Sequence, residues 1–96
     1  MLKFVDVVGK KYRIIEVDLD AANGHVGRTI SHHCVIEVYH PQDEQAMRDT
    51  VLHEVLHACL FEAGKGGCED VVASLAPTLL YVIRKNPKLI EFLTER

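Results

Sequence analysis

The chain has 96 residues, of which 48% are hydrophobic and 26% are charged, and its formal net charge at pH 7 is −3. This length suits one domain with one modest core, so we expect residues 1–96 to form a single domain. Scattered Lys and Arg residues within an acidic chain argue against a nucleic-acid-binding surface. The apolar runs are too short for a membrane span.

The cysteines bear on the cellular compartment. Cys34, Cys59 and Cys68 are odd in number and form no C-x-x-C pair. The first residues lack the long apolar region of a signal peptide, and Asp6 follows closely. These features favour a reducing cytoplasm over a disulfide framework.

The first forty residues are expected to form three or four short β-strands in a small antiparallel sheet. Residues 12–17 are rich in β-branched and aromatic side chains, residues 25–30 are a plausible second strand, and residues 34–39 alternate clearly. Turn-forming residues at 20–24 separate the first two strands.

The alternating strand carries a further expectation. Ile36 and Val38 share its purely aliphatic face, so they should lie in the core, with Glu37 outside. If the strand lies at the sheet edge, its free backbone groups could bind an extended peptide, with Glu37 as a guard against unwanted pairing. We therefore expect a peptide or protein substrate to bind along the strand from Val35 to Tyr39.

A long helix is expected over residues 42–63. Pro41 suits its first turn, and Asp43 and Glu44 place negative charge at the positive end of the helix dipole. Gly64 offers a stop. Apolar residues recur at three- and four-residue steps, namely Leu52, Val55, Leu56, Cys59, Leu60 and Ala63.

Two more helices are expected towards the C-terminus. Residues 69–86 have helical periodicity, and Pro77 within them should kink or divide the helix. Residues 87–95 are expected to form a short helix. Its inward-facing residues should be Leu89, Phe92 and Leu93.

The run His53-Glu54-Val55-Leu56-His57 reads H-E-x-x-H, the feature of the sequence most indicative of function. On a helix, the two histidines lie one turn apart on one face and can bind the same zinc ion. Glu54 then sits near the open coordination position, where it can take a proton from a water molecule. The motif predicts a zinc metallopeptidase with Glu54 as general base.

A catalytic zinc usually has a third protein ligand. Leu60 and Ala63 stand where a metzincin motif would have its glycine and last histidine, so that pattern is absent. Glu69 shares the apolar face of the second helix, whereas Asp70 falls on a more exposed side, so helical spacing favours Glu69. Cys68 is a rival ligand, because thiolates bind zinc well.

The order of elements and the segment Thr50–Ala58 resemble a known group. A small sheet, an H-E-x-x-H helix and a glutamate-bearing helix are similar to the minimal core of gluzincin-type zincins, and in particular to ImmA/IrrE-like and short phage-encoded metallopeptidases. Glu69–Pro77 also resembles the short phage-encoded members. The resemblance implies an α+β fold, a Zn²⁺ cofactor held by His53, His57 and Glu69, and peptide-bond hydrolysis.

Other interpretations stay open at this point. The chain could be a zincin-like module that binds zinc and regulates or binds another protein without catalysis, or a metal-free protein in which H-E-x-x-H is coincidence. An enzyme would also need an oxyanion donor. The candidates are Tyr39, His40, Tyr81, His32 and His33.

Overall fold

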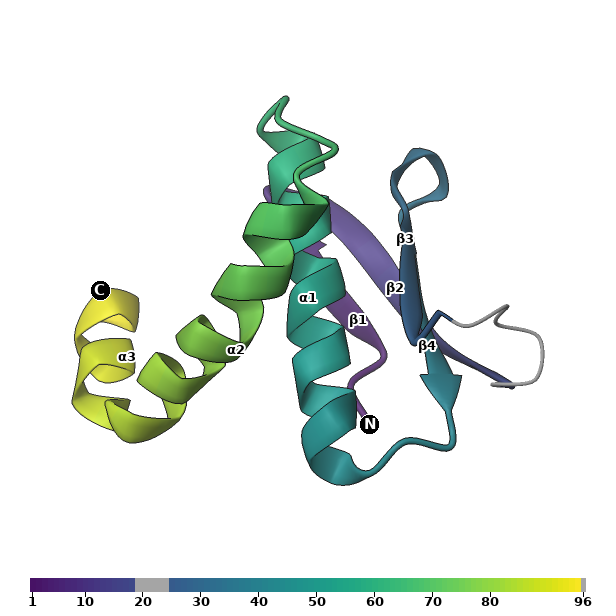
Figure 1. Ribbon diagram of the computed structural model, residues 1–96. Coiled ribbons are helices and arrows are strands. Elements are labelled where there is room, and N and C mark those ends of the chain that lie inside the picture. The colour runs from purple at the N-terminus through teal and green to yellow at the C-terminus, as the bar shows by residue number, and fades with distance from the viewer. Residues whose placement is uncertain (19–24, 96) are drawn as a thin grey trace.

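A computed structural model describes residues 1–18 and 25–95. The expected turn at 20–24 lies outside the described residues. The fold is α+β, as the sequence predicts, with a four-stranded sheet and three α-helices (Figure 1). The elements are β1 (Phe4–Val7), β2 (Lys10–Asp18), β3 (Gly27–Ile30), a 3-10 turn (Ser31–His33), β4 (Val35–His40), α1 (Glu44–Glu62), α2 (Glu69–Lys85) and α3 (Pro87–Thr94).

The sheet is mixed, so the expectation of an antiparallel sheet is wrong in one pairing. The strand order is β1-β2-β4-β3, and β2 pairs with β4 in parallel while the other two pairings are antiparallel. β4 is inserted between β2 and β3 instead of joining the end of a meander. The more apolar strand thereby takes the interior place, and the short strand β3, which carries Arg28, takes the edge.

The expectation that the strand from Val35 to Tyr39 lies at the sheet edge is therefore wrong. β4 hydrogen-bonds to a strand on each side, so it has no free backbone edge for a peptide. Ile36 and Val38 have no exposed surface, because they face α1. That burial favours a central position, where both neighbouring strands exclude water. The edge beside β4 is formed by β3.

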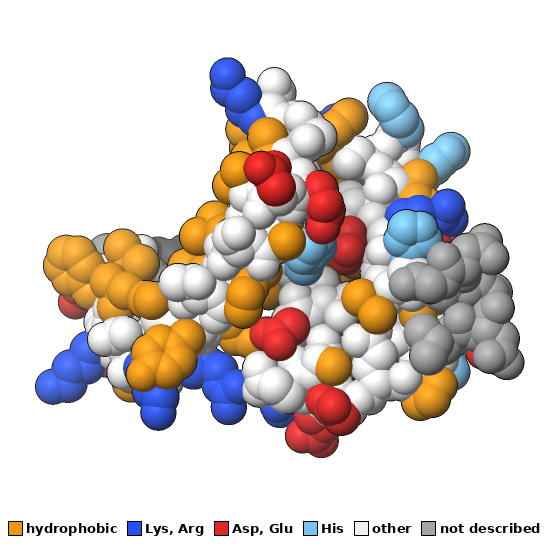
Figure 2. Space-filling model, viewed as in Figure 1, with side chains coloured by type: hydrophobic (Ala, Val, Ile, Leu, Met, Phe, Trp, Pro, Cys, Tyr) orange, Lys and Arg blue, Asp and Glu red, His pale blue; other side chains and the backbone are white. Residues whose placement is uncertain are grey.

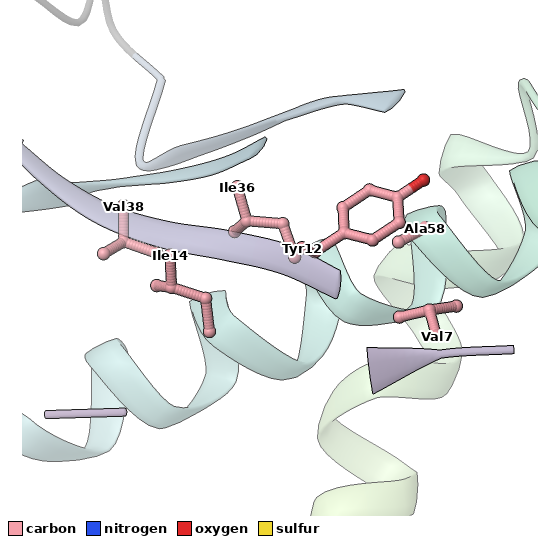
Figure 3. Close-up of a cluster of buried hydrophobic side chains, with 6 residues drawn as sticks. All are labelled: Val7, Tyr12, Ile14, Ile36, Val38 and Ala58. Atoms are coloured by element: carbon pink, nitrogen blue, oxygen red, sulfur yellow. The ribbon is translucent and has the colours of Figure 1, made fainter. Parts of the chain in front are cut away.

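The main core lies between the sheet and α1, which crosses one face of the sheet (Figure 3). The prediction that Ile36 and Val38 are internal is confirmed. Tyr12 is fully buried beside them, and its hydroxyl donates to Glu62 Oε2 at 2.7 Å. Burial, followed by this hydrogen bond, raises the pKa of Tyr12 to about 12. The core residues are Val7, Tyr12, Ile14, Ile36, Val38 and Ala58.

β1 was not among the individually expected strands. It pairs with β2 through a two-residue turn in which Val8 and Gly9 both have positive φ, at 53° and 87°. This is the backbone of a type I′ hairpin, for which Asn-Gly or Asp-Gly is the usual signal. Valine rarely occupies such a position, so the turn carries no recognisable sequence signature.

α1 begins two residues later than expected, because the Asp43 carboxylate caps it by accepting the Ala46 N–H at 2.8 Å. Pro41 precedes this cap. The expected apolar stripe is only partly correct, since Cys59 is exposed. α1 lies between the sheet and α2, so some of its apolar residues pack against the sheet and others against α2. Its contacts with the sheet core are made by Met47, Val51, Val55 and Ala58.

α2 continues through Pro77 as one helix, so the expectation of a division at Pro77 is wrong. Pro77 is exposed, and the carbonyl left without an N–H partner can bond water there. α3 forms as expected, but Leu89, Phe92 and Leu93 are 40%, 71% and 65% exposed, so their expected inward orientation is wrong. α3 packs mainly on the end of α2 and reaches no sheet surface that could cover them (Figure 1). Among the described residues, no helix is both long and apolar enough to cross a membrane.

Candidate metal centre

α1 presents the two histidines of the motif on one side. His53 and His57 are separated by one helical turn, and their ring centroids lie 4.9 Å apart. Their side chains are 23% and 19% exposed, so both rings are shielded yet open to a small ligand. α1 is held by its contacts with the sheet and with α2, which supplies a rigid base for the pair.

The turn between α1 and α2 brings Glu69 back to these histidines. Gly64 has a φ of +77°, and the N–H groups of Gly64 and Lys65 donate to the carbonyls of Phe61 and Leu60. This is a Schellman ending, which closes α1 and reverses the chain. Val72 and Ala76 are buried where α2 packs against α1. The first residue of α2 is thereby placed beside the last turns of α1.

The Glu69 carboxylate bridges the two imidazoles. Its Oε1 lies 2.9 Å from His53 Nε2, and its Oε2 lies 2.5 Å from His57 Nε2. The potential ligand atoms of the three residues all lie within 4.8 Å of one another. Tetrahedral zinc with bonds of about 2.0–2.2 Å needs ligand atoms roughly 3.3 Å apart. A shift of the exposed Glu69 side chain by a fraction of that spacing makes room, so two imidazoles and one carboxylate fit a zinc ion.

The two rival ligands lie elsewhere. Asp70 lines an outer surface of α2 with Val71 and Ser74, away from the two histidines. The Cys68 thiol donates to the Lys65 carbonyl at 3.4 Å, within the turn between the helices. Among the described residues, the group of His, Cys, Asp and Glu side chains close enough to share one ion consists of His53, His57 and Glu69.

This arrangement gives a test of the third ligand. Glu69→Ala should weaken zinc binding by more than about tenfold, since even outer-shell partners of metal ligands contribute that much. Asp70→Ala, a matched change one residue away, should leave the affinity nearly unchanged. A competition titration against a chelating dye measures both. Equal effects, or a larger effect of Asp70→Ala, would show that Glu69 is not a ligand.

Glu54 is buried, with 6% of its surface exposed, and is held by β3. The Thr29 hydroxyl lies 2.7 Å from Glu54 Oε1 and 2.9 Å from the Glu54 carbonyl oxygen. Gly27 allows this approach, because a Cβ there would lie 2.7 Å from Thr50 Cγ2 and 3.1 Å from Glu54 Oε2. A side chain at position 27 would push β3 away from Glu54. Neither Thr29 nor Gly27 was among the site residues expected from the sequence.

Two cavities meet at Glu54. The larger, of about 640 Å³, runs from His53 and Glu69 towards Asp49, and the smaller, of about 320 Å³, runs from His57 towards Phe61 and the glycine turn. Gly27 lines both of them. Figure 2 shows histidine and acidic side chains gathered where this face is hollowed, between the helices and the strand that borders them. The candidate metal centre therefore lies midway along an open groove.

The expected oxyanion donors do not line these two cavities. The Tyr39 hydroxyl donates to Glu37 Oε1 at 3.1 Å, and burial, followed by this bond, raises the pKa of Tyr39. His32 packs edge-to-face on Phe61, and Tyr81 lines a different cavity. His40 and His33 are exposed and contribute to neither cavity wall. His25 instead lines the larger cavity with His53 and Glu54, a position that sequence spacing cannot reveal.

No match emerged when the chain was compared with protein-family models, with curated proteins and with solved structures.

Proposed function

We propose that the protein is a zinc-dependent peptidase of the zincin type, with His53, His57 and Glu69 as metal ligands and Glu54 as general base. The observation that carries this proposal is the convergence of the three potential ligands beside a buried glutamate, midway along a groove. Two imidazoles and one carboxylate leave a fourth position open, as in catalytic zinc sites.

The chemistry divides between the metal and the chain. A zinc ion held by His53, His57 and Glu69 would supply Lewis acidity for a scissile carbonyl and an attacking water molecule. Glu54 is the group that accepts a proton from water and later gives it to the leaving amine. Thr29 holds the Glu54 carboxylate by a hydrogen bond, and the close approach of Gly27 keeps β3 against it. His25 is the candidate donor to the developing oxyanion, because it lines the same cavity.

An extended peptide suits this groove better than a compact substrate. β3 is an edge strand and contributes Gly27 to both cavities. The Val26 carbonyl accepts the Tyr39 N–H at 3.0 Å. In an antiparallel pair every second residue of a strand bonds to its neighbour, so the N–H and C=O groups of Gly27 and Thr29 point away from β4. These groups are available to pair with a substrate strand. A peptide bound along β3 would pass Glu54 and the candidate metal centre.

The proposal is tested with the purified, untagged protein, loaded with zinc and incubated with a peptide library. We expect cleavage products that mass spectrometry detects with zinc present and that disappear after chelation. Restoring zinc should restore cleavage. A zinc-loaded, folded protein that cleaves no member of the library would contradict peptidase activity.

A second function is favoured by one observation. The Glu54 carboxylate is buried and its Oε1 accepts the Thr29 hydroxyl, a contact that a purely structural glutamate would also make. It supports a zinc-binding module that regulates or binds another protein without hydrolysis. Both functions require zinc. Cleavage of the peptide library, and its loss when Glu54 is replaced by glutamine, would distinguish the peptidase from the non-catalytic module.

Thr29→Val tests whether the hydrogen bond serves catalysis. Valine keeps the shape of threonine but removes the donor, so we expect kcat to fall about 10- to 100-fold, the usual worth of a hydrogen bond to a charged group. KM and zinc content should change little, and Thr29→Ser should restore most of kcat. Thr78→Val, on α2, is the matched control. An unchanged kcat in Thr29→Val would show that this hydrogen bond does not serve catalysis.

A further inference from the structure

We propose that the larger cavity is a subsite for a lysine or arginine side chain of the substrate, recognised by Asp49. This inference rests on the proposed peptidase function and adds a specificity to it. Asp49, His53 and Glu54 line the same cavity, so a side chain entering from the metal centre points towards the Asp49 carboxylate.

The spacing along α1 matches a long side chain. Asp49 precedes His53 by four residues, which at a rise of about 1.5 Å per residue is roughly 6 Å. A lysine or arginine side chain spans a similar distance from its Cα to its charged group. Shorter side chains would leave the end of the cavity unfilled.

The walls suit an aliphatic stem. α2 contributes Ala73, Ala76 and Pro77, and β3 contributes Gly27, so the cavity between Glu54 and Asp49 is bordered by small or apolar groups. Methylene groups of lysine or arginine bury well against such walls while the charged head reaches a polar partner.

The charge at the end of the cavity selects the head group. Asp49 is half-buried, and its one side-chain contact within residues 1–18 and 25–95 is a long hydrogen bond of 3.5 Å from Gln45 Nε2. It forms no ion pair within the described part of the chain. Arg84 and Lys85 border a neighbouring cavity that Asp49 also lines, and the Arg84 guanidinium is bound to Gln45. An apolar side chain would desolvate the Asp49 carboxylate without compensation, whereas a cation would pair with it.

The test uses the zinc-loaded protein and peptides that differ only at the residues flanking the cleaved bond. We expect wild type to favour Lys or Arg over Glu at one of these positions by at least about tenfold, the effect of one close charge pair in a partly buried site. Asp49→Asn should remove most of this preference, and Asp49→Lys should reverse it.

Asp70→Lys is the control, because it makes the same charge change on the outer surface of α2 and should keep the wild-type preference. A preference that survives in Asp49→Lys, or a wild type that cleaves Lys and Glu peptides equally, would overturn the subsite. A loss of preference in Asp70→Lys equal to that in Asp49→Lys would assign the effect to overall charge and also overturn it.

A binding measurement separates this inference from the peptidase proposal. Should the zinc-loaded wild type cleave no peptide, calorimetry with the same Lys and Glu peptides still tests the subsite. Tighter binding of the Lys peptide that Asp49→Lys abolishes would support the subsite in a non-catalytic protein. Equal binding of both peptides, or no binding of either, would reject it.

Discussion

Replacing Glu54 by glutamine is expected to reduce peptide hydrolysis by about 10²- to 10⁴-fold, the usual contribution of a general base. Glutamine has the same shape and can still contact the Thr29 hydroxyl, but it cannot accept a proton from water. Zinc content should stay at the wild-type level, because Glu54 is not among the three potential ligands. Steady-state kinetics together with metal analysis measure both quantities.

Glu44→Gln provides the matched control for this variant. Glu44 lies in the first turn of the same helix, where its exposed carboxylate pairs with Arg48 at 3.5 Å. The same chemical change there should leave turnover and zinc content unaltered. Hydrolysis by Glu54→Gln at the wild-type rate would exclude Glu54 as the base, and loss of zinc in this variant would give it a structural role instead.

The second large effect is expected from His57→Ala. The wild-type protein should bind about one zinc ion per chain, and removal of one imidazole should reduce this towards zero at micromolar zinc, since one histidine and one carboxylate seldom hold the ion. Added zinc should raise the melting temperature of wild type, because a ligand that binds only the folded state stabilises it. The melting temperature of His57→Ala should not respond.

His33→Ala is the control for this experiment. His33 is exposed in the turn before β4 and, within the described part of the chain, belongs to no group that could share an ion. Its replacement should leave zinc stoichiometry and the zinc-dependent melting shift intact. Circular dichroism should show that His57→Ala is folded, because the core between α1 and the sheet does not include His57. Full zinc binding by a folded His57→Ala protein would remove this residue from the site.

The tertiary contacts explain why several expectations from the sequence were wrong. The inward orientation expected for Phe92 and Leu93 assumed that every apolar helix face finds a partner in the chain. Their exposure shows that periodicity identifies an apolar face and says nothing about whether another element reaches it. Pro77 was expected to kink or divide α2, yet its exposed position allows the helix to continue undivided.

The sequence by itself determined the features that depend on local geometry. The H-E-x-x-H spacing places His53 and His57 one turn apart wherever that helix lies, and alternation places Ile36 and Val38 on one face of their strand. Adjacent residues of a helix point in different directions, so helical phase also favoured Glu69, which shares the apolar face of the second helix, over Asp70. These relations extend over a few residues, so they follow from backbone periodicity without knowledge of the fold.

The tertiary structure decided the relations between distant segments. The insertion of β4 between β2 and β3 made β3 the edge strand, and this placed Gly27 and Thr29 against Glu54, some 25 residues away in the chain. The packing of α2 on α1 then formed the cavity that joins Asp49 to the candidate metal centre. Strand order and helix packing result from competition among all apolar surfaces for one core, so no local pattern could reveal these neighbours.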